Sequence, residues 1–238
     1  MMARNFIVLD TEGADTVKHF DGKAHPESSL FYDLGFVVVD GRTGLTLAEY
    51  SFINSDVYFN KSLMTSAYYA NKREHYNAGL MYDWDIADTR TIMQAFADAC
   101  EKYHVRDVWA YNARYDMTIT AHTVDAMSNG FVKEFIPNGV QWRDIWDYAG
   151  STLCKTRKYV EWCLERGYVS AKGNPMTRAE VVYQYLIEDD TFIEAHTALE
   201  DARIEADILR AAKRRKQKAR HSIGQGWRDA AKIAKSTK

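Results

Sequence analysis

The chain has 238 residues, of which 46% are hydrophobic and 27% charged. This length and balance are typical of one globular domain, and they exclude a disordered or fibrous chain. No apolar run approaches the ~18 residues of a membrane span, and the N-terminal run stops at Asp10 without a cleavage-site pattern. We therefore expect a cytoplasmic protein that does not contact a membrane. The three cysteines show no CxxC spacing, so we expect free thiols.

The net charge of −2 conceals two regions of opposite charge. Residues 213–238 contain ten lysines or arginines and one acidic residue, which leaves −11 on residues 1–212. We therefore divide the chain into a domain over 1–212 and a basic C-terminal tail over 213–238. An acidic body with a basic arm suits a protein that gathers carboxylates around metal and meets a polyphosphate. A solvated helical end explains the same pattern equally well.

Apolar periodicity and turn residues predict alternating strands and helices. In chain order, the predicted elements are strands 5–11, 30–40 and 45–53, helices 64–78 and 88–104, strand 107–111, helix 112–127, strand 140–145, helix 145–166 with a break near Gly150, a helix opened by a capping box at Thr177 and Glu180, and helix 197–213. The polar stretch 12–29 is predicted to be a long loop. This order predicts an α/β fold with a mixed five-stranded sheet flanked by helices.

Two carboxylates follow the first predicted strand, in Asp10-Thr-Glu12. Residues two apart in a strand point to the same face, so Asp10 and Glu12 lie side by side. Like charges this close repel, and a divalent cation such as Mg²⁺ relieves the repulsion. Ordinary polar residues at a strand end explain the same two positions.

The segment Asn112-Ala-Arg-Tyr-Asp116 follows the strand 107–111 directly. Positions i and i+4 share a helix face, so Asn112 and Asp116 are predicted to face one cleft at the end of that strand. Helix capping by Asn112 beside a solvated Asp116 is the alternative interpretation.

A histidine and an aspartate five residues apart occur in His196-Thr-Ala-Leu-Glu-Asp201. On one continuous helix they would point ~140° apart, so we place His196 in the loop before the helix and Asp201 in its first turns. A histidine titrates near neutrality, which suits a general base. A hydrogen-bonded loop histidine remains the alternative.

The three segments in this order resemble the motifs of the DEDDh 3′–5′ exonuclease superfamily, which includes the proofreading subunit of bacterial DNA polymerase III, ribonuclease T and oligoribonuclease. The matching stretches are FIVLDTEG, WAYNARYDMTI and EAHTALEDARIEADIL, and the third is the most specific. The resemblance implies a ribonuclease H-like fold, two divalent metal ions (Mg²⁺ or Mn²⁺) and cleavage from the 3′ end of single-stranded DNA or RNA. It places Asp10, Glu12 and Asp201 at one metal, with Asp10 also reaching the second and Asp116 near it. It makes His196 the base that takes a proton from the attacking water.

Other positions are candidates for substrate contact or for structure. Asn112 and Gly13 are candidate substrate contacts, although the long loop after Glu12 departs from the family pattern. Arg214 and Arg215 in the tail are candidate contacts for phosphate, or the tail docks onto a polymerase or other replication partner. We interpret Asp33, before Gly35, as structural, and we expect Asp144 and Asp147 to be solvated.

Two alternatives to an exonuclease remain open from the sequence. The first is a nucleic-acid-binding accessory protein of the same fold with little turnover, in which the basic tail would carry salt-sensitive binding. The second is an endonuclease of the ribonuclease H-like class, against which the His-x-x-x-x-Asp motif argues.

Overall fold

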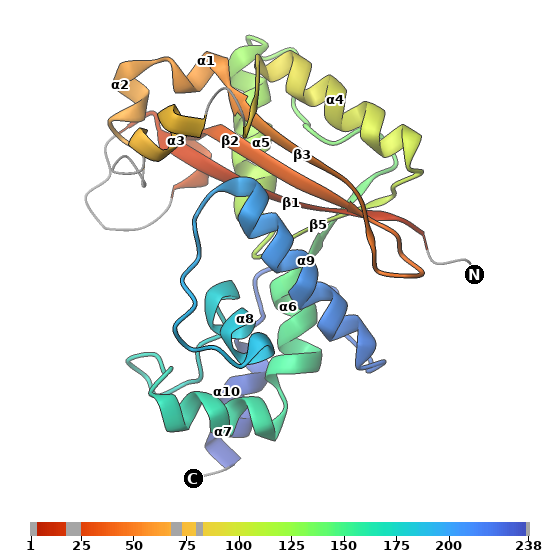
Figure 1. The fold of residues 1–238 in the computed structure, drawn as a ribbon, viewed down its shortest axis with the longest axis vertical. Helices are drawn as coiled ribbons and strands as arrows, with labels where there is room; N and C mark the ends of the chain where they lie inside the picture. Colours follow the sequence, from red (N-terminus) through yellow and green to blue (C-terminus); the bar gives the residue numbers. More distant parts are fainter. Residues whose placement is uncertain (1–3, 18–24, 68–72, 80–82, 237–238) are drawn as a thin grey trace.

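A computed structural model describes residues 4–17, 25–67, 73–79 and 83–236. These residues form a mixed six-stranded sheet with helices on both faces (Figure 1). The strands in their order across the sheet are β4 (Asp85–Ala87), β3 (Thr46–Asn54), β2 (Ser29–Val39), β1 (Phe6–Asp15), β5 (Asp107–Ala110) and β6 (Gln141–Asp144). Strand β2 is antiparallel to β1 and β3, and the other neighbours are parallel. The predicted α/β class is confirmed, and the sixth strand is the three-residue edge strand β4, which is too short for a periodic signal.

Helices cover the sheet in two layers (Figure 1). The helices in chain order are η1 (Pro26–Ser28), α1 (Ser55–Tyr58), α2 (Lys61–Met64), α3 (Arg73–Gly79), α4 (Thr89–Lys102), α5 (Arg114–Met127), α6 (Ile145–Ala149), the π-helical turn η3 (Gly150–Cys154), α7 (Arg157–Arg166), α8 (Ala179–Ile187), α9 (Ala198–Arg214) and α10 (Arg228–Ser236). Helices α4 and α5 lie on one face, and α9 with α6 and α8 lies on the other. Among the described residues, none of these helices has the length and apolar character needed to cross a membrane.

The alternation of side chains along β1 connects the core to the site. Ile7 and Leu9 are buried in the core beneath α4 and α5, whereas Phe6 and Val8 are buried beneath α9. Because every second residue shares a face, Asp10 continues the face of Val8 toward α9. Gly35 of β2 lets α9 approach closely, since a Cβ there would collide with the backbone of Ala198 and Leu199.

Several predicted boundaries are wrong, and pairing between distant segments explains the differences. Strand β1 continues through Glu12 to Asp15 instead of ending in a loop, because these residues pair with β2 across a bulge after Glu12. Residues 18–24 of the predicted loop lie outside the described residues. The predicted helix 64–78 is not continuous, since α2 ends at Met64 and α3 begins at Arg73, with 68–72 outside the described residues.

Of the two later helical predictions, one is confirmed and one is wrong. The predicted break near Gly150 is confirmed: the helix over 145–166 divides at the π-helical turn η3, where the backbone of Gly226 packs directly on Gly150. Helix α8 begins at Ala179 and has no side-chain cap. The Thr177 hydroxyl instead accepts a hydrogen bond from Trp146 Nε1 at 2.8 Å, so the predicted capping box does not form.

The described part of the predicted tail, residues 213–236, is largely built into the fold. Helix α9 extends to Arg214, and α10 folds back with Ala230 and Ala234 buried. Asp147 is fully buried and accepts hydrogen bonds from Arg220 Nη1 at 3.3 Å and from the backbone and hydroxyl of Ser222 at 2.9 and 2.6 Å. Asp144 is also buried and accepts from the Gly224 N–H at 2.6 Å. The expectation that both aspartates are solvated is therefore wrong.

Candidate active site

A cleft of about 340 Å³ opens where β1, β5 and the start of α9 meet. Its walls contain all five predicted catalytic residues together with both predicted substrate contacts near them. These residues are Asp10, Glu12, Gly13, Asn112, Asp116, His196 and Asp201. Residues from three separate stretches of sequence thus share one cavity.

Asp10 lies at the centre of the carboxylates. Burial raises its pKa well above the usual value, and the charges of Glu205, Asp116, Asp201 and Glu12 raise it further. Strand register explains the position of Glu12, because Asp10 pairs with Gly35 and Glu12 with Asp33 on the same neighbouring strand. Five acidic groups at short range repel one another, and a cation bound among them would lower their common energy.

Asp116 lies in the first turn of α5 and is buried. Thr11, which faces the α5 side of β1, donates a hydrogen bond from Oγ1 to Asp116 Oδ1 at 2.8 Å. Burial raises the pKa of Asp116 to about 7, although the Thr11 hydrogen bond acts in the opposite direction. Asp116 is therefore fixed in orientation beside Asp10 and is costly to ionise without a cation.

Asn112 lies in the turn before α5, because the helix begins at Arg114. Its φ of 59° is in the left-handed region, which asparagine tolerates better than most residues. Asn112 and Asp116 line one cleft, as predicted, but they do not share a helix face, since Asn112 precedes the helix. The Asn112 N–H donates to Asp144 Oδ1 at 3.2 Å, and this hydrogen bond holds the turn at the edge of the cleft.

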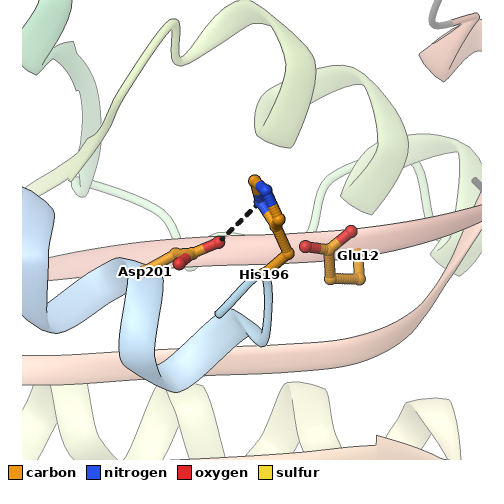
Figure 2. A group of neighbouring side chains, drawn as sticks. All are labelled: Glu12, His196 and Asp201. Carbon is orange, nitrogen blue, oxygen red and sulfur yellow. Dashed lines mark ion pairs between the residues drawn. The ribbon is translucent and has the colours of Figure 1, made fainter. Parts of the chain in front are cut away.

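His196 lies in the loop before α9, and Asp201 lies in the first turn of that helix. His196 Nδ1 is 3.8 Å from Asp201 Oδ2 and 3.9 Å from Glu194 Oε2. Figure 2 shows His196, Asp201 and Glu12 close together, with the dashed line joining His196 to Asp201. The His196 φ of 54° places the residue in the left-handed region, and such backbone strain is common at functional positions.

The start of α9 is anchored by a carboxylate from the neighbouring strand. Asp33 of β2 is fully buried and accepts hydrogen bonds from the Ala198 N–H at 3.0 Å and the Tyr76 hydroxyl at 2.8 Å. Burial raises the pKa of Asp33 to about 6. Because a helix N-terminus favours a nearby anion, Asp33 holds the first turn that carries Asp201.

Two further acidic residues contribute to the site and were missed in the sequence. Glu205 is buried one helical turn after Asp201, and its Oε2 accepts the Tyr111 N–H at 3.1 Å. Burial raises the pKa of Glu205 well above the usual value, and the charges of Asp116 and Asp201 raise it further. The i,i+4 spacing from Asp201 could have identified Glu205, and the position two residues before His196 could have identified Glu194.

The donor set fits a divalent metal ion. Glu12, His196 and Asp201 each offer a ligand atom, and these atoms lie within 4.8 Å of one another. Carboxylate oxygens are the ligands that Mg²⁺ and Mn²⁺ prefer. The mutual repulsion around Asp10 indicates the same chemistry independently of these distances.

Arg214 and Arg215 are not brought to the cleft. Arg214 ends α9 and Arg215 caps it, whereas Asp201 lies in its first turn. At 1.5 Å per residue, Arg214 lies roughly 20 Å from Asp201 along the helix axis. Only a strand that extends well beyond the catalytic residues would reach them.

No protein-family model matches this sequence. No curated protein matches it either. Solved structures match its fold: the nuclease domain of 3′hExo, a DEDDh family member bound to rAMP, has a TM-score of 0.58 at 10% identity over 93% of this chain and 98% of that chain. The 3′-exonuclease described in 3′-end recognition of the histone mRNA stem-loop has a TM-score of 0.59 at 10% identity, over 94% and 69% of the two chains.

E. coli Exonuclease I in complex with a 5cy-dT13 oligonucleotide has a TM-score of 0.52 at 13% identity over 90% of this chain. The chain spans only 41% of the length of that enzyme. These similarities confirm that the chain has the ribonuclease H-like fold of DEDDh exonucleases, as its motifs predicted.

Proposed function

We propose that this protein is a metal-dependent exonuclease that removes nucleotides from the 3′ end of single-stranded DNA or RNA. The observation that carries the proposal is the convergence of four carboxylates and a histidine, from three distant motifs, on one cleft. A protein that retained only the fold would have no physical reason to keep five acidic groups in mutual repulsion at that place.

The carboxylates are the groups that would hold the metal. Asp10, Glu12 and Asp201 would bind one divalent ion, and Asp10 with Asp116 would bind a second. Such a pair of ions supplies an activated water and stabilises charge on the attacking and leaving oxygens. Thr11 fixes the orientation of Asp116, and Asp33 fixes the helix turn that carries Asp201.

His196 would accept the proton of the attacking water. Glu194 and Asp201 both face Nδ1, which favours a proton on that nitrogen, so Nε2 is the nitrogen that would act as the base. If Asp201 held a metal, Glu194 would be the carboxylate that still orients the ring. The left-handed loop at His196 keeps the imidazole at the cleft rather than on the helix.

The named neighbours support the substrate class. One is bound to rAMP and another to a DNA oligonucleotide, so the fold accommodates either sugar. Asn112 and Gly13 line the cleft and are the proposed contacts for the terminal nucleotide. A Cβ on Gly13 would come within 2.5 Å of Ile119 Cδ1 and 2.9 Å of the Tyr115 hydroxyl, so a larger residue there would have to displace the ends of these two side chains.

The test uses 5′-labelled single-stranded DNA and RNA of one sequence, with Mg²⁺ or Mn²⁺, with and without chelator. A ladder that shortens from the 3′ end, disappears with chelator and disappears in Asp10→Ala supports the proposal and reveals the preferred sugar. Cleavage of a circular strand would instead identify an endonuclease. Tight, salt-sensitive binding without any ladder would favour the accessory protein.

A further inference from the structure

A second pocket adjoins the catalytic cleft. It has a volume of about 490 Å³ and a mostly apolar lining that includes Tyr111, Trp146, Met176 and Ala179. Tyr111 and Asn112 line both cavities, so the two meet at the turn that follows β5. A chain molecule lying in the cleft can therefore extend into this pocket.

The two aromatic rings of the pocket are held by the protein itself. The Tyr111 hydroxyl donates to the Thr177 carbonyl at 2.6 Å, and Trp146 Nε1 donates to the Thr177 hydroxyl at 2.8 Å. The backbone of Gly226 packs against the indole of Trp146. With their polar atoms already paired, the rings offer preorganised apolar surface, and little side-chain entropy is lost when a ligand binds.

We propose that this pocket binds the nucleobase on the 5′ side of the scissile phosphate, the penultimate base of the strand. This inference rests on the proposed function, because the carboxylates locate the scissile phosphate. Gly13, Ser29 and Tyr115 line the cleft near the end of β1 and suit the terminal nucleoside. The pocket at Tyr111 lies beyond the end of β5, on the side of the cleft away from Gly13, and would receive the next nucleotide of the strand.

The lining also indicates how the base is recognised. Aromatic and thioether surface stacks on any base, so the pocket accepts all four with modest preferences. Arg178 is exposed at the same pocket, where its guanidinium can pair with a backbone phosphate. A mononucleotide would not reach this pocket, whereas a dinucleotide would.

The test combines altered substrates with an altered pocket. Oligonucleotides carry a single abasic site at the terminal, penultimate or fourth position from the 3′ end. Cleavage is measured as KM and kcat with Mg²⁺, and binding is measured by anisotropy in chelator. We expect the penultimate abasic site to raise KM and Kd about tenfold relative to the fourth position, with a smaller change in kcat.

The variant Ala179→Phe fills the pocket without removing a hydrogen bond. We expect it to raise KM on the intact strand about tenfold and to abolish the penalty of the penultimate abasic site. Ala171→Phe is the matched control, since Ala171 is exposed in the preceding loop and lies outside the pocket. Thermal unfolding of both variants checks that the fold is intact.

The outcomes separate this inference from the proposed function. A ladder with no penultimate penalty, or a penalty that persists in Ala179→Phe, overturns the pocket and leaves the exonuclease standing. A penultimate binding penalty that Ala179→Phe removes, with no ladder under any condition, supports the pocket and contradicts the exonuclease.

Discussion

The two ends of α9 carry opposite charges, and the charged groups at the two ends differ in how accessible they are to a ligand. The first turn carries Asp201, which faces the other carboxylates across an open cleft, and the last turn carries Lys213. Burial disfavours charge near both ends: it raises the pKa of Asp10, which lies on β1 in the cleft at the first turn, and lowers that of Lys213 in the last turn to about 8. Lys213 Nζ lies 3.7 Å from the centroid of the Phe6 ring and 4.9 Å from that of Trp109.

The two ends differ in whether a cation or a substrate can reach the charged groups. At the acidic end, repelling groups share a cavity that a cation and a substrate can enter. At the basic end, by which we mean the last turn of α9 and the segment that follows it, Lys213 is covered by aromatic rings and Arg220 is paired with Asp147. The net charge of a segment therefore does not identify which of its residues are available to a ligand.

The largest effect is expected from the acidic end. Asp10→Asn should lower kcat on the order of a thousandfold or more, since metal-assisted charge stabilisation contributes several kcal/mol to the transition state. The same variant should be at least as stable as the wild type in chelator, because one repelling charge is removed. Asp98→Asn, on an exposed face of α4, serves as the control and should change neither quantity. Retained activity in Asp10→Asn would remove Asp10 from the proposed chemistry.

Loss of the general base should have the next largest effect. His196→Ala should lower kcat about 10²- to 10⁴-fold with little change in KM, because the base acts only in the transition state. Glu194→Gln should lower kcat less, since the ring stays in place but loses one orienting carboxylate. A KM effect without a kcat effect in His196→Ala would mean that His196 binds substrate instead.

The basic end should respond in stability rather than in catalysis. Asp147→Ala should lower the free energy of unfolding by about 3 kcal/mol, since it leaves Arg220 without its fully buried partner. Asp229→Ala removes a more exposed partner of Arg220 and should cost about 1 kcal/mol or less. Denaturant unfolding measures both. Equal, negligible losses would show that this region does not stabilise the domain.

Stability should depend on pH, and metal should change that dependence. The folded-state pKa values of Asp116 and Asp33 are about 7 and about 6, both above the unfolded value. Between about pH 4 and 7 the folded state therefore binds more protons, so stability in chelator falls as pH rises. Mg²⁺ binds the ionised carboxylates, so its stabilising effect should be larger at pH 8 than at pH 5.5.

Thermal unfolding at the two pH values, with and without chelator, measures this effect. Asp116→Asn should flatten the curve obtained in chelator, because it removes one of the buried carboxyl groups whose pKa is raised in the folded state. A higher unfolding temperature at pH 8 than at pH 5.5 in chelator would contradict the prediction.

The spacing of residues along the sequence was enough to predict the parts of the site that are formed by residues close in sequence. The two-residue repeat of a strand put Asp10 and Glu12 on one face, and the five-residue spacing put His196 before the helix of Asp201. Both follow from backbone geometry alone. The α/β class was predictable for the same reason.

The remaining features depend on contacts between distant residues. Strand β1 reaches Asp15 only because β2 pairs with it. The start of α9 is held in place by Asp33, which accepts a hydrogen bond from the N–H of Ala198, 165 residues later. Asp147 is buried because Ser222, 75 residues later, donates to it. A local sequence pattern does not indicate partners that are far away in the sequence. For that reason the segment 213–238 was predicted to be a tail.

The smallest effects concern the exposed arginines at the basic end. Arg214→Ala with Arg215→Ala leaves the fold intact, unlike deletion of 213–238, which would remove α10 and the Arg220–Asp147 pair. If a long strand follows α9, the double variant should weaken binding of a 20-nucleotide strand a few-fold at low salt and reduce the salt dependence by about two charges. Binding of a four-nucleotide strand should not change, because roughly 20 Å separates these arginines from Asp201.

Lys213→Met is the matched control: it removes a charge that the Phe6 and Trp109 rings already cover, so it should leave binding of both strands unchanged. Equal binding of the long strand by wild type and double variant would mean that the exposed charge at this end of α9 does not meet the substrate at all.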